Sequence, residues 1–215
     1  MHRRPQNQDV TTFDSTGYVV VPKLLTDAQC DALTDSLPEV AGSGSRTLLA
    51  RKPFREVVTL LRSNALVGRV LNGCAAVQCT LFQKSNDHNW SVRLHRDTVV
   101  CVSGDGCWHA TGLKEGMQTA RPPRPFIDAC VALRLQLDGA LVEDIRVVPG
   151  SHLDTMQHPR QSAKPVPVPR GGALLMRPSL VHGSAKLEAK RRRRVLHYLF
   201  APVELPDQYR WYDSI

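Results

Sequence analysis

The sequence lacks any long apolar run. No stretch approaches the eighteen or so consecutive apolar residues that a membrane-spanning helix needs, and no apolar segment follows the basic residues 1–5. Internal repeats and low-complexity linkers are also missing. Because 42% of the 215 residues are apolar, the chain can still bury one substantial core. We therefore expect a soluble, cytoplasmic protein with one domain, residues 1–215.

Paired cysteine motifs are absent as well. None of the six cysteines stands in a C-x-x-C pair, and their spacing is not that of a small disulfide scaffold. We expect reduced and mostly packed thiols. Because paired cysteines are absent, we do not expect a zinc ion bound by cysteine. The six are Cys30, Cys74, Cys79, Cys101, Cys107 and Cys130.

Negative charge is scarce relative to positive charge. Lys and Arg number 28 and Asp and Glu 20, which gives a formal net charge of +8. Such a balance suits an anionic substrate, a nucleic acid or plain solubility. The densest basic run, residues 190–194, has no interleaved aromatics for base stacking, so nucleic acid is the weaker interpretation. We expect most of this run to be a solvated loop ahead of a strand.

Helix signals lie in the N-terminal third of the chain. Residues 1–16 look like a polar lead, and residues 17–22 form a short β-rich run. A helix should begin near residue 25, with Thr26 as its cap, because apolar residues then recur at spacings of three and four. Residues 54–71 predict one or two further amphipathic helices. Residues 1–73 should therefore be a mainly helical support.

The rest of the chain, residues 74–215, has the pattern of short strands separated by Gly, Pro, Asn and Asp. This predicts a mainly β protein with N-terminal helices, either a sandwich or a barrel. The expected strands are residues 75–83, 129–137, 145–148, 173–176 and 195–201.

Two segments, residues 104–125 and 155–170, show no regular pattern. Long irregular loops in a compact domain commonly cover or bind something, although disorder is the alternative. We expect the first to be a lid loop.

A metal site is suggested by the triplet His95-Arg96-Asp97. On a strand, residues i and i+2 point to the same face, so an imidazole and a carboxylate can grip one cation. A second such triplet, His152-Leu153-Asp154, follows a turn sequence and lies only 28 residues before His182, against 85 residues from Asp97. We favour the first triplet, because 85 residues leave room for strands to depart and return.

His182 is the expected third ligand, although a solvent-facing turn histidine is the alternative. Arg193 follows it by eleven residues and opens an apolar strand. Two histidines and one carboxylate leave three positions open on an octahedral iron(II). A 2-oxo acid and dioxygen can fill them, and the far carboxylate of that acid would suit the planar fork of Arg193, with Ser184 as a further donor.

At this point the sequence resembles the phytanoyl-CoA dioxygenase family. The resemblance runs from about residue 75 to the end, in an ordered series of short pieces. These are residues 89–90, 94–97, 114–116, 122–123, 133–138, 148–152, 171–178, 182–184 and 193–197.

The resemblance implies a double-stranded β-helix (jelly roll, cupin-like) that uses Fe(II), 2-oxoglutarate and O2. Oxidation of a small molecule, by default hydroxylation, would be coupled to decarboxylation of 2-oxoglutarate to succinate. It makes His95, Asp97 and His182 the iron ligands and gives Arg193 and Ser184 the distal carboxylate of the co-substrate.

Three further residues are carried over less directly. Trp108 would correspond to an aromatic at the active-site mouth, and Lys84 and Arg134 would reach the pocket from neighbouring strands or else lie on the surface. The chain departs from the family at Arg96, where Gln is commoner, and at residues 142–145, where an Asn-Gly turn is usual.

The substrate is not given by the sequence. A CoA thioester or another anionic small molecule suits the positive charge. Two rival interpretations remain, a nucleic-acid demethylase with the same iron chemistry and a catalytically silent jelly-roll binding protein. Succinate release that depends on His95 would separate the enzyme from the silent protein.

Overall fold

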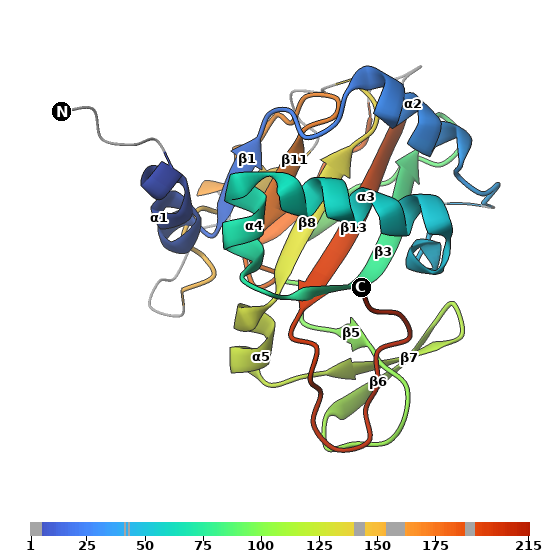
Figure 1. Cartoon of the computed structure of the whole chain (residues 1–215), viewed down its shortest axis with the longest axis vertical. Helices are drawn as coiled ribbons and strands as arrows, with labels where there is room; N and C mark the ends of the chain where they lie inside the picture. The colour runs from blue at the N-terminus through green and yellow to red at the C-terminus, as the bar shows by residue number, and fades with distance from the viewer. Residues whose placement is uncertain (1–5, 41, 43, 140–144, 154–161, 188–191) are drawn as a thin grey trace.

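The computed structural model describes residues 6–40, 42, 44–139, 145–153, 162–187 and 192–215 (Figure 1). Its helices mostly precede the strands, as the sequence predicts. They are α1 (Gln6–Thr16), α2 (Asp27–Asp35), the short 3-10 helix η1 (Leu48–Ala50), α3 (Lys52–Ser63), α4 (Ala65–Leu71) and α5 (Arg124–Ala129). Thr26 caps α2 through a capping box with Gln29, because each residue satisfies a backbone N–H of the other.

The main sheet is antiparallel, with the strand order β1-β11-β8-β13-β3-β2. Its strands are β1 (Tyr18–Val21), β2 (Gly44–Ser45), β3 (Ala75–Lys84), β8 (Val131–Gln136), β11 (Ala173–Met176) and β13 (Arg193–Ala201). The long pair β13–β3 runs through the middle of the molecule (Figure 1). Strands distant in sequence are thereby brought side by side.

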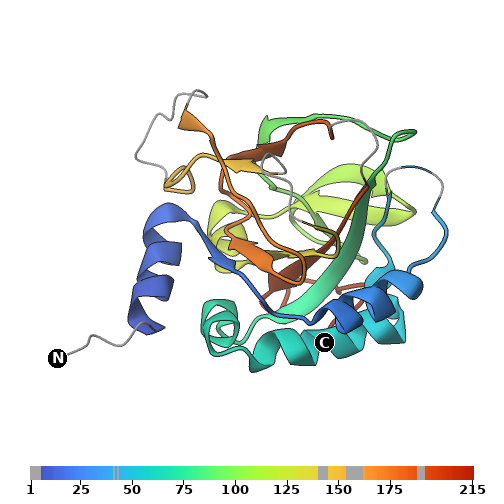
Figure 2. The ribbon, with the colours of Figure 1, turned by 90° about the horizontal axis from the view of Figure 1, so that it is seen from above.

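Two smaller sheets complete the fold. The first has the order β10-β9-β12-β4 and the second the order β5-β7-β6. Their strands are β4 (Val92–His95), β5 (Val100–Cys101), β6 (His109–Lys114), β7 (Met117–Arg121), β9 (Arg146–Val147), β10 (Lys164–Pro165) and β12 (His182–Ser184). Seen from above, α2 and α3 lie along one side of the main sheet and the remaining strands lie on the other (Figure 2). This is the predicted jelly roll with N-terminal helices.

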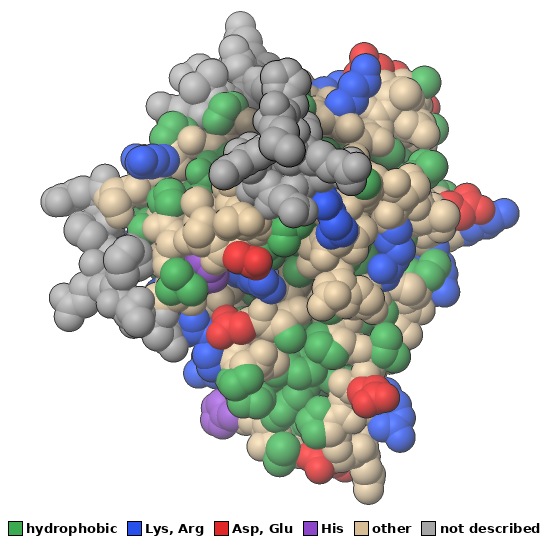
Figure 3. Space-filling model, turned by 60° about the vertical axis from the view of Figure 1, so that its left-hand side comes forward, with side chains coloured by type: hydrophobic (Ala, Val, Ile, Leu, Met, Phe, Trp, Pro, Cys, Tyr) green, Lys and Arg blue, Asp and Glu red, His purple; other side chains and the backbone are tan. Residues whose placement is uncertain are grey.

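The positive charge is not gathered on the face shown in Figure 3. There, Lys and Arg side chains are spread among acidic and neutral ones. Within the described residues, no helix has the length and apolarity that a membrane crossing requires. All six cysteines are free thiols, as expected.

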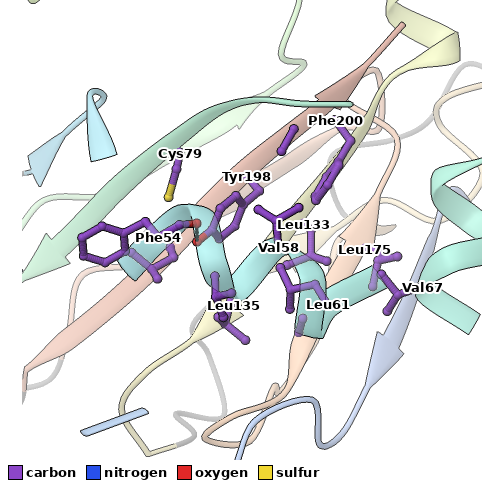
Figure 4. Close-up of a cluster of buried hydrophobic side chains, with 14 of the residues drawn as sticks. Phe54, Val58, Leu61, Val67, Cys79, Leu133, Leu135, Leu175, Tyr198 and Phe200 are labelled. Carbon is purple, nitrogen blue, oxygen red and sulfur yellow. Dashed lines mark hydrogen bonds between the residues drawn. The ribbon is translucent and has the colours of Figure 1, made fainter. Parts of the chain in front are cut away.

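The core lies between the main sheet and helices α3 and α4 (Figure 4). Alternate strand residues such as Leu133 and Leu135 point to this side, and Phe54 and Leu61 meet them from α3. The phenol of Tyr198 donates to the carbonyl of Phe54 at 2.9 Å, so its one polar group is satisfied. Each such buried large apolar side chain contributes about 1.5–3 kcal/mol. The opposite side of the same strands is therefore left to line a different space.

Residues 1–16 are not simply a polar lead, because α1 forms within them. Because α1 has few apolar residues, the apolar pattern of the sequence did not predict this helix. The helix is held by Phe13, which is buried under the Arg177 guanidinium at 4.6 Å, and by the ion pair between Arg177 and Asp14 at 3.0 Å. The N-terminal support also supplies β1 and β2 to the main sheet, so it is not purely helical.

The expected loop at residues 104–125 contains the hairpin β6–β7. Every residue of β6 is exposed, so no apolar alternation marked it as a strand. Its two-residue turn, Glu115-Gly116, has φ of 50° and 77°, which is typical of a type I′ hairpin turn. Of the other expected loop, residues 154–161 lie outside the described residues, as do residues 140–144 and 188–191.

Candidate active site

A cavity of about 420 Å³ opens on the side of the main sheet that faces away from α3. Its walls combine residues of β3, β8 and β13 with residues of β4 and β12. A volume of this size suits a small-molecule site. Described residues that lie between Arg46 and Leu199 in the sequence thus meet around one space.

His95 and His182 face each other across the pair β4–β12, where they are register partners. Asp97 follows the end of β4, and its N–H donates to the carbonyl of Pro178 at 2.8 Å. One Asp97 oxygen lies 3.3 Å from Nε2 of His95 and the other lies 3.6 Å from Nε2 of His182. The three ligand atoms lie within 4.8 Å of one another, so a single cation can contact all three. The expected strand ends at His95, and Asp97 reaches the site from the next segment.

Both imidazoles are oriented through their other nitrogen. Nδ1 of His95 lies 2.9 Å from the carbonyl of Arg93, and Nδ1 of His182 lies 2.9 Å from the carbonyl of Leu180. Since a carbonyl can only accept, each Nδ1 carries the hydrogen and each Nε2 is directed at Asp97. This is the tautomer that a metal-binding histidine needs.

Burial lowers the pKa of His182, which favours its neutral, metal-binding form. The hydrogen bond to Asp97 raises the pKa of His95. Burial alone would raise the pKa of Asp97, but the hydrogen bond from His95 and the nearby His182 outweigh it and hold the pKa below its usual range. Asp97 is thus charged, and the space between His95 and Asp97 can hold either a proton or a metal ion. The side chains of these two residues are 40% and 37% exposed, so the site is open on one side.

The second His-x-Asp triplet is used differently. His152 is buried, with Nε2 at 3.0 Å from the carbonyl of Asp14, and it does not line the cavity. Asp154 lies outside the described residues. The structure therefore brings together the triplet that loop lengths favoured.

At another part of the cavity, Lys84 of β3 lies directly opposite Arg193 of β13. Both residues are buried, with exposures of 0% and 2%. Nζ of Lys84 donates to Oγ of Ser184 at 3.0 Å and to the carbonyl of Ala185 at 2.6 Å. Two buried cations in neighbouring positions, with a hydroxyl beside them, make a site for an anion.

The crowding of positive charge is visible in the pKa values. Burial, followed by Arg193 and Arg134, lowers the pKa of Lys84 to about 7. Burial, followed by Arg134, lowers the pKa of Arg193 to about 9. Arg134 itself lines the cavity from β8. Lys84 and Arg134 are therefore pocket residues, not surface residues.

Trp108 is the one predicted site residue that the structure does not bring to the cavity. Its indole is 8% exposed and packs against Phe126 and Tyr209, with ring centroids 4.9 and 5.0 Å away. The backbone N–H of Trp108 donates to the Tyr209 hydroxyl at 3.1 Å. The predicted position of Trp108 at the active-site mouth was wrong, because its apolar indole is buried in this separate aromatic cluster.

Sequence reasoning missed His197 and Thr80, which line the cavity beside Arg134. The signal for both was the strand period of two. His197 stands four residues after Arg193 on β13, and Thr80 stands four residues before Lys84 on β3, so each shares a sheet face with a predicted residue.

Comparison with known proteins agrees with this arrangement. The sequence model of the family described as phytanoyl-CoA dioxygenase matches residues 13–195. No curated protein matches the sequence.

Several solved structures share the fold. The non-heme alpha ketoglutarate dependent epimerase SnoN from nogalamycin biosynthesis has a TM-score of 0.68 at 16% identity, covering 92% of this chain and 81% of that one. HygX from Streptomyces hygroscopicus, with iron bound, has a TM-score of 0.67 at 17% identity, covering 96% of each chain. The carbocyclase SnoK, also from nogalamycin biosynthesis, has a TM-score of 0.67 at 15% identity, covering 92% and 84%.

Proposed function

The chain belongs to the phytanoyl-CoA dioxygenase family and is a 2-oxoglutarate-dependent non-haem iron enzyme, and from this premise we propose that it hydroxylates a small molecule. The reaction would convert 2-oxoglutarate to succinate and carbon dioxide. One observation carries the proposal: a two-histidine, one-carboxylate cluster and a buried pair of cations share a single cavity.

Fe(II) would be held by His95, Asp97 and His182. The donor set fits, because the two Nε2 atoms and the carboxylate converge and both Nδ1 atoms are fixed by carbonyls. Two imidazoles and one carboxylate are the ligands that non-haem iron oxygenases use. When bound, iron with dioxygen supplies the oxidising chemistry, and the protein supplies binding and orientation.

The distal carboxylate of 2-oxoglutarate would be held by Arg193, Lys84 and Ser184. Arg193 offers a planar fork for two parallel hydrogen bonds, Lys84 adds a second charge, and the Ser184 hydroxyl lies within reach of Lys84. Such a carboxylate would offset the repulsion between the two cations. Of the neighbours, HygX was crystallised with nickel and 2-oxoglutarate, and SnoN with Fe3+ and alpha ketoglutarate.

The rest of the cavity would take the substrate. We propose that the segment 104–125, with its hairpin, covers the open side, and that residues 1–215 act as one cytoplasmic domain. A small molecule is favoured because the cavity is only about 420 Å³. HygX was also crystallised with hygromycin B, a small molecule, in addition to nickel and 2-oxoglutarate.

The test is succinate release from 2-oxoglutarate by purified protein supplied with Fe(II) and dioxygen. Even without its substrate, we expect slow turnover that His95→Ala abolishes. His88→Ala is the control, since His88 is exposed and does not line the cavity. A protein that binds 2-oxoglutarate but never releases succinate, with or without a metabolite library, would be the silent binding protein instead.

A nucleic-acid substrate is a separate outcome of the same assay. Stimulation of succinate release by methylated oligonucleotides, and binding that weakens steeply with salt, would indicate a demethylase.

A further inference from the structure

A second polar row crosses the cavity face of the main sheet. Register pairing places His197 of β13 opposite Thr80 of β3 on one side and opposite Arg134 of β8 on the other. All three side chains line the cavity. The row lies four residues along β13 from Arg193, a strand distance of about 13 Å. It is therefore distinct from the row that contains Lys84.

Basic side chains outnumber the acidic ones around the cavity. Among the described lining residues, six are basic and one, Asp97, is acidic. Arg96 donates to the carbonyls of Ser179 and Ser151 at 2.8 and 2.7 Å, and Arg46 is paired with Glu115 at 3.7 Å. These two guanidinium groups already have partners.

Arg134, in contrast, has no such hydrogen-bond or ion-pair partner among the described residues. The acidic group whose charge acts on it is that of Asp97. Arg134 is half-buried in the cavity wall, and a guanidinium there without an acceptor carries a cost that a ligand with an acceptor would remove. Burial lowers the pKa of Arg134 to about 10, which still leaves it charged at neutral pH.

The neighbours of Arg134 add unused hydrogen-bonding groups. Thr80 accepts from Nε2 of Gln78 at 2.8 Å, which leaves its own hydroxyl hydrogen to donate elsewhere. Nδ1 of His197 is buried and has no hydrogen-bond partner within the described part of the chain. A donor-rich row with one full positive charge suits an oxygen anion.

We propose that the primary substrate carries an anionic group, a carboxylate or a phosphate, and that Arg134 binds it with help from Thr80 and His197. This inference rests on the proposed function and names its substrate class. The co-substrate does not need Arg134, because its distal carboxylate is matched by Lys84 and Arg193 and its other end by the metal.

The experiment compares charged and uncharged probes of the same shape. Protein saturated with Fe(II) and 2-oxoglutarate, without oxygen, is mixed with benzoate or benzamide, butyrate or butyramide, and phenyl phosphate or phenol. We expect the anionic members to raise Tm, by about 3 °C or more at ten times Kd, and the neutral members to leave it unchanged.

Variants then locate the effect. Arg134→Gln should abolish the shift while changing the Kd for 2-oxoglutarate less than about threefold, and Arg134→Lys should keep part of it because the charge remains. Lys164→Gln removes one charge from exposed β10, outside the cavity, and should behave as the unaltered protein does.

Three outcomes would overturn the inference. The anionic and neutral probes could act alike, the shift could persist in Arg134→Gln, or that variant could raise the Kd for 2-oxoglutarate about tenfold and so assign Arg134 to the co-substrate. Each leaves the proposed function standing. Failure of the unaltered protein to bind 2-oxoglutarate would contradict the proposed function itself.

Discussion

Arg193 and Lys84 are register partners on adjacent antiparallel strands, and both are buried. Like charges directly opposite each other destabilise a sheet. A bound anionic ligand would offset the repulsion between these two cations. Arg193→Gln should therefore raise the KM for 2-oxoglutarate by about thirtyfold or more, the equivalent of about 2 kcal/mol from charged hydrogen bonds. The maximal rate of succinate release at saturating 2-oxoglutarate should change much less.

Arg194→Gln is the matched control for this prediction. Arg194 is the next residue along β13, but its guanidinium pairs with Asp138 and does not line the cavity. An equal rise in KM for both variants would show that loss of charge or strand stability, not the fork of Arg193, caused the effect.

The affinity for 2-oxoglutarate should depend on pH through Lys84. Burial and the two arginines lower the pKa of its ammonium to about 7 in the free protein, and a bound carboxylate would raise that pKa again. Binding therefore takes up a proton. Between pH 7 and 8, below the pKa of about 9 of Arg193, the Kd should rise with pH, with a limit of about tenfold per unit.

Calorimetric titration at pH 8 in buffers of different ionisation enthalpy measures this proton uptake. Lys84→Met cannot titrate, so it should bind 2-oxoglutarate more weakly at pH 7 and show a flat pH dependence over the window. A slope that survives in Lys84→Met would assign the proton to another group.

Local patterns predicted the fold well where burial alternates along the chain. The strand that opens at Arg193 and the capped helix that follows Thr26 both confirm this, because each has a signal within a few residues. The hairpin β6–β7 has no such signal: its strand β6 is wholly exposed and is held by backbone pairing and a glycine turn. Stabilisation of that kind leaves no apolar alternation in the sequence, so the sequence did not predict the hairpin.

The site was predictable in part for the same reason. Spacing and loop length selected His95, Asp97 and His182 over the triplet at His152, and the structure does bring those three together. The position of Trp108 depends on which apolar cluster it joins, a tertiary choice that one sequence does not reveal. His197 was missed because its role depends on cross-strand neighbours.

Fe(II) should stabilise the protein if the three ligands hold it. At a concentration of one hundred times Kd a ligand adds about 2.7 kcal/mol, which corresponds to about 5–10 °C in Tm for a chain of this size. A thermal melt without oxygen, with and without Fe(II), measures the shift, and a chelator should reverse it. His182→Ala should abolish the shift, and His88→Ala, outside the cavity, should keep it. Equal shifts in both variants would place the metal elsewhere.

Arg96 stands where the family more often has glutamine, and its contacts suggest that it positions the metal ligands. Its guanidinium reaches two carbonyls, those of Ser179 and Ser151, from the segment between His95 and Asp97. The Ser151 hydroxyl in turn accepts from the N–H of Val181, next to His182. Arg96 thus links the two segments that carry these three residues. Glutamine is shorter and carries both of its N–H donors on one nitrogen, so it cannot span the two carbonyls.

We therefore expect Arg96→Gln to weaken Fe(II) binding by about 10- to 100-fold, the usual effect of losing a group that orients metal ligands. Arg96→Lys, which keeps the charge, should lose less, and Arg51→Gln, at an exposed arginine that does not line the cavity, should lose nothing. Fe(II) titration without oxygen gives the Kd, and the Tm of the metal-free protein gives stability separately. A positioning role for Arg96 requires that loss of its two carbonyl contacts weakens Fe(II) binding. If Arg96→Gln lowers that Tm but leaves the Kd for Fe(II) unchanged, Arg96 stabilises the fold and does not position the metal ligands.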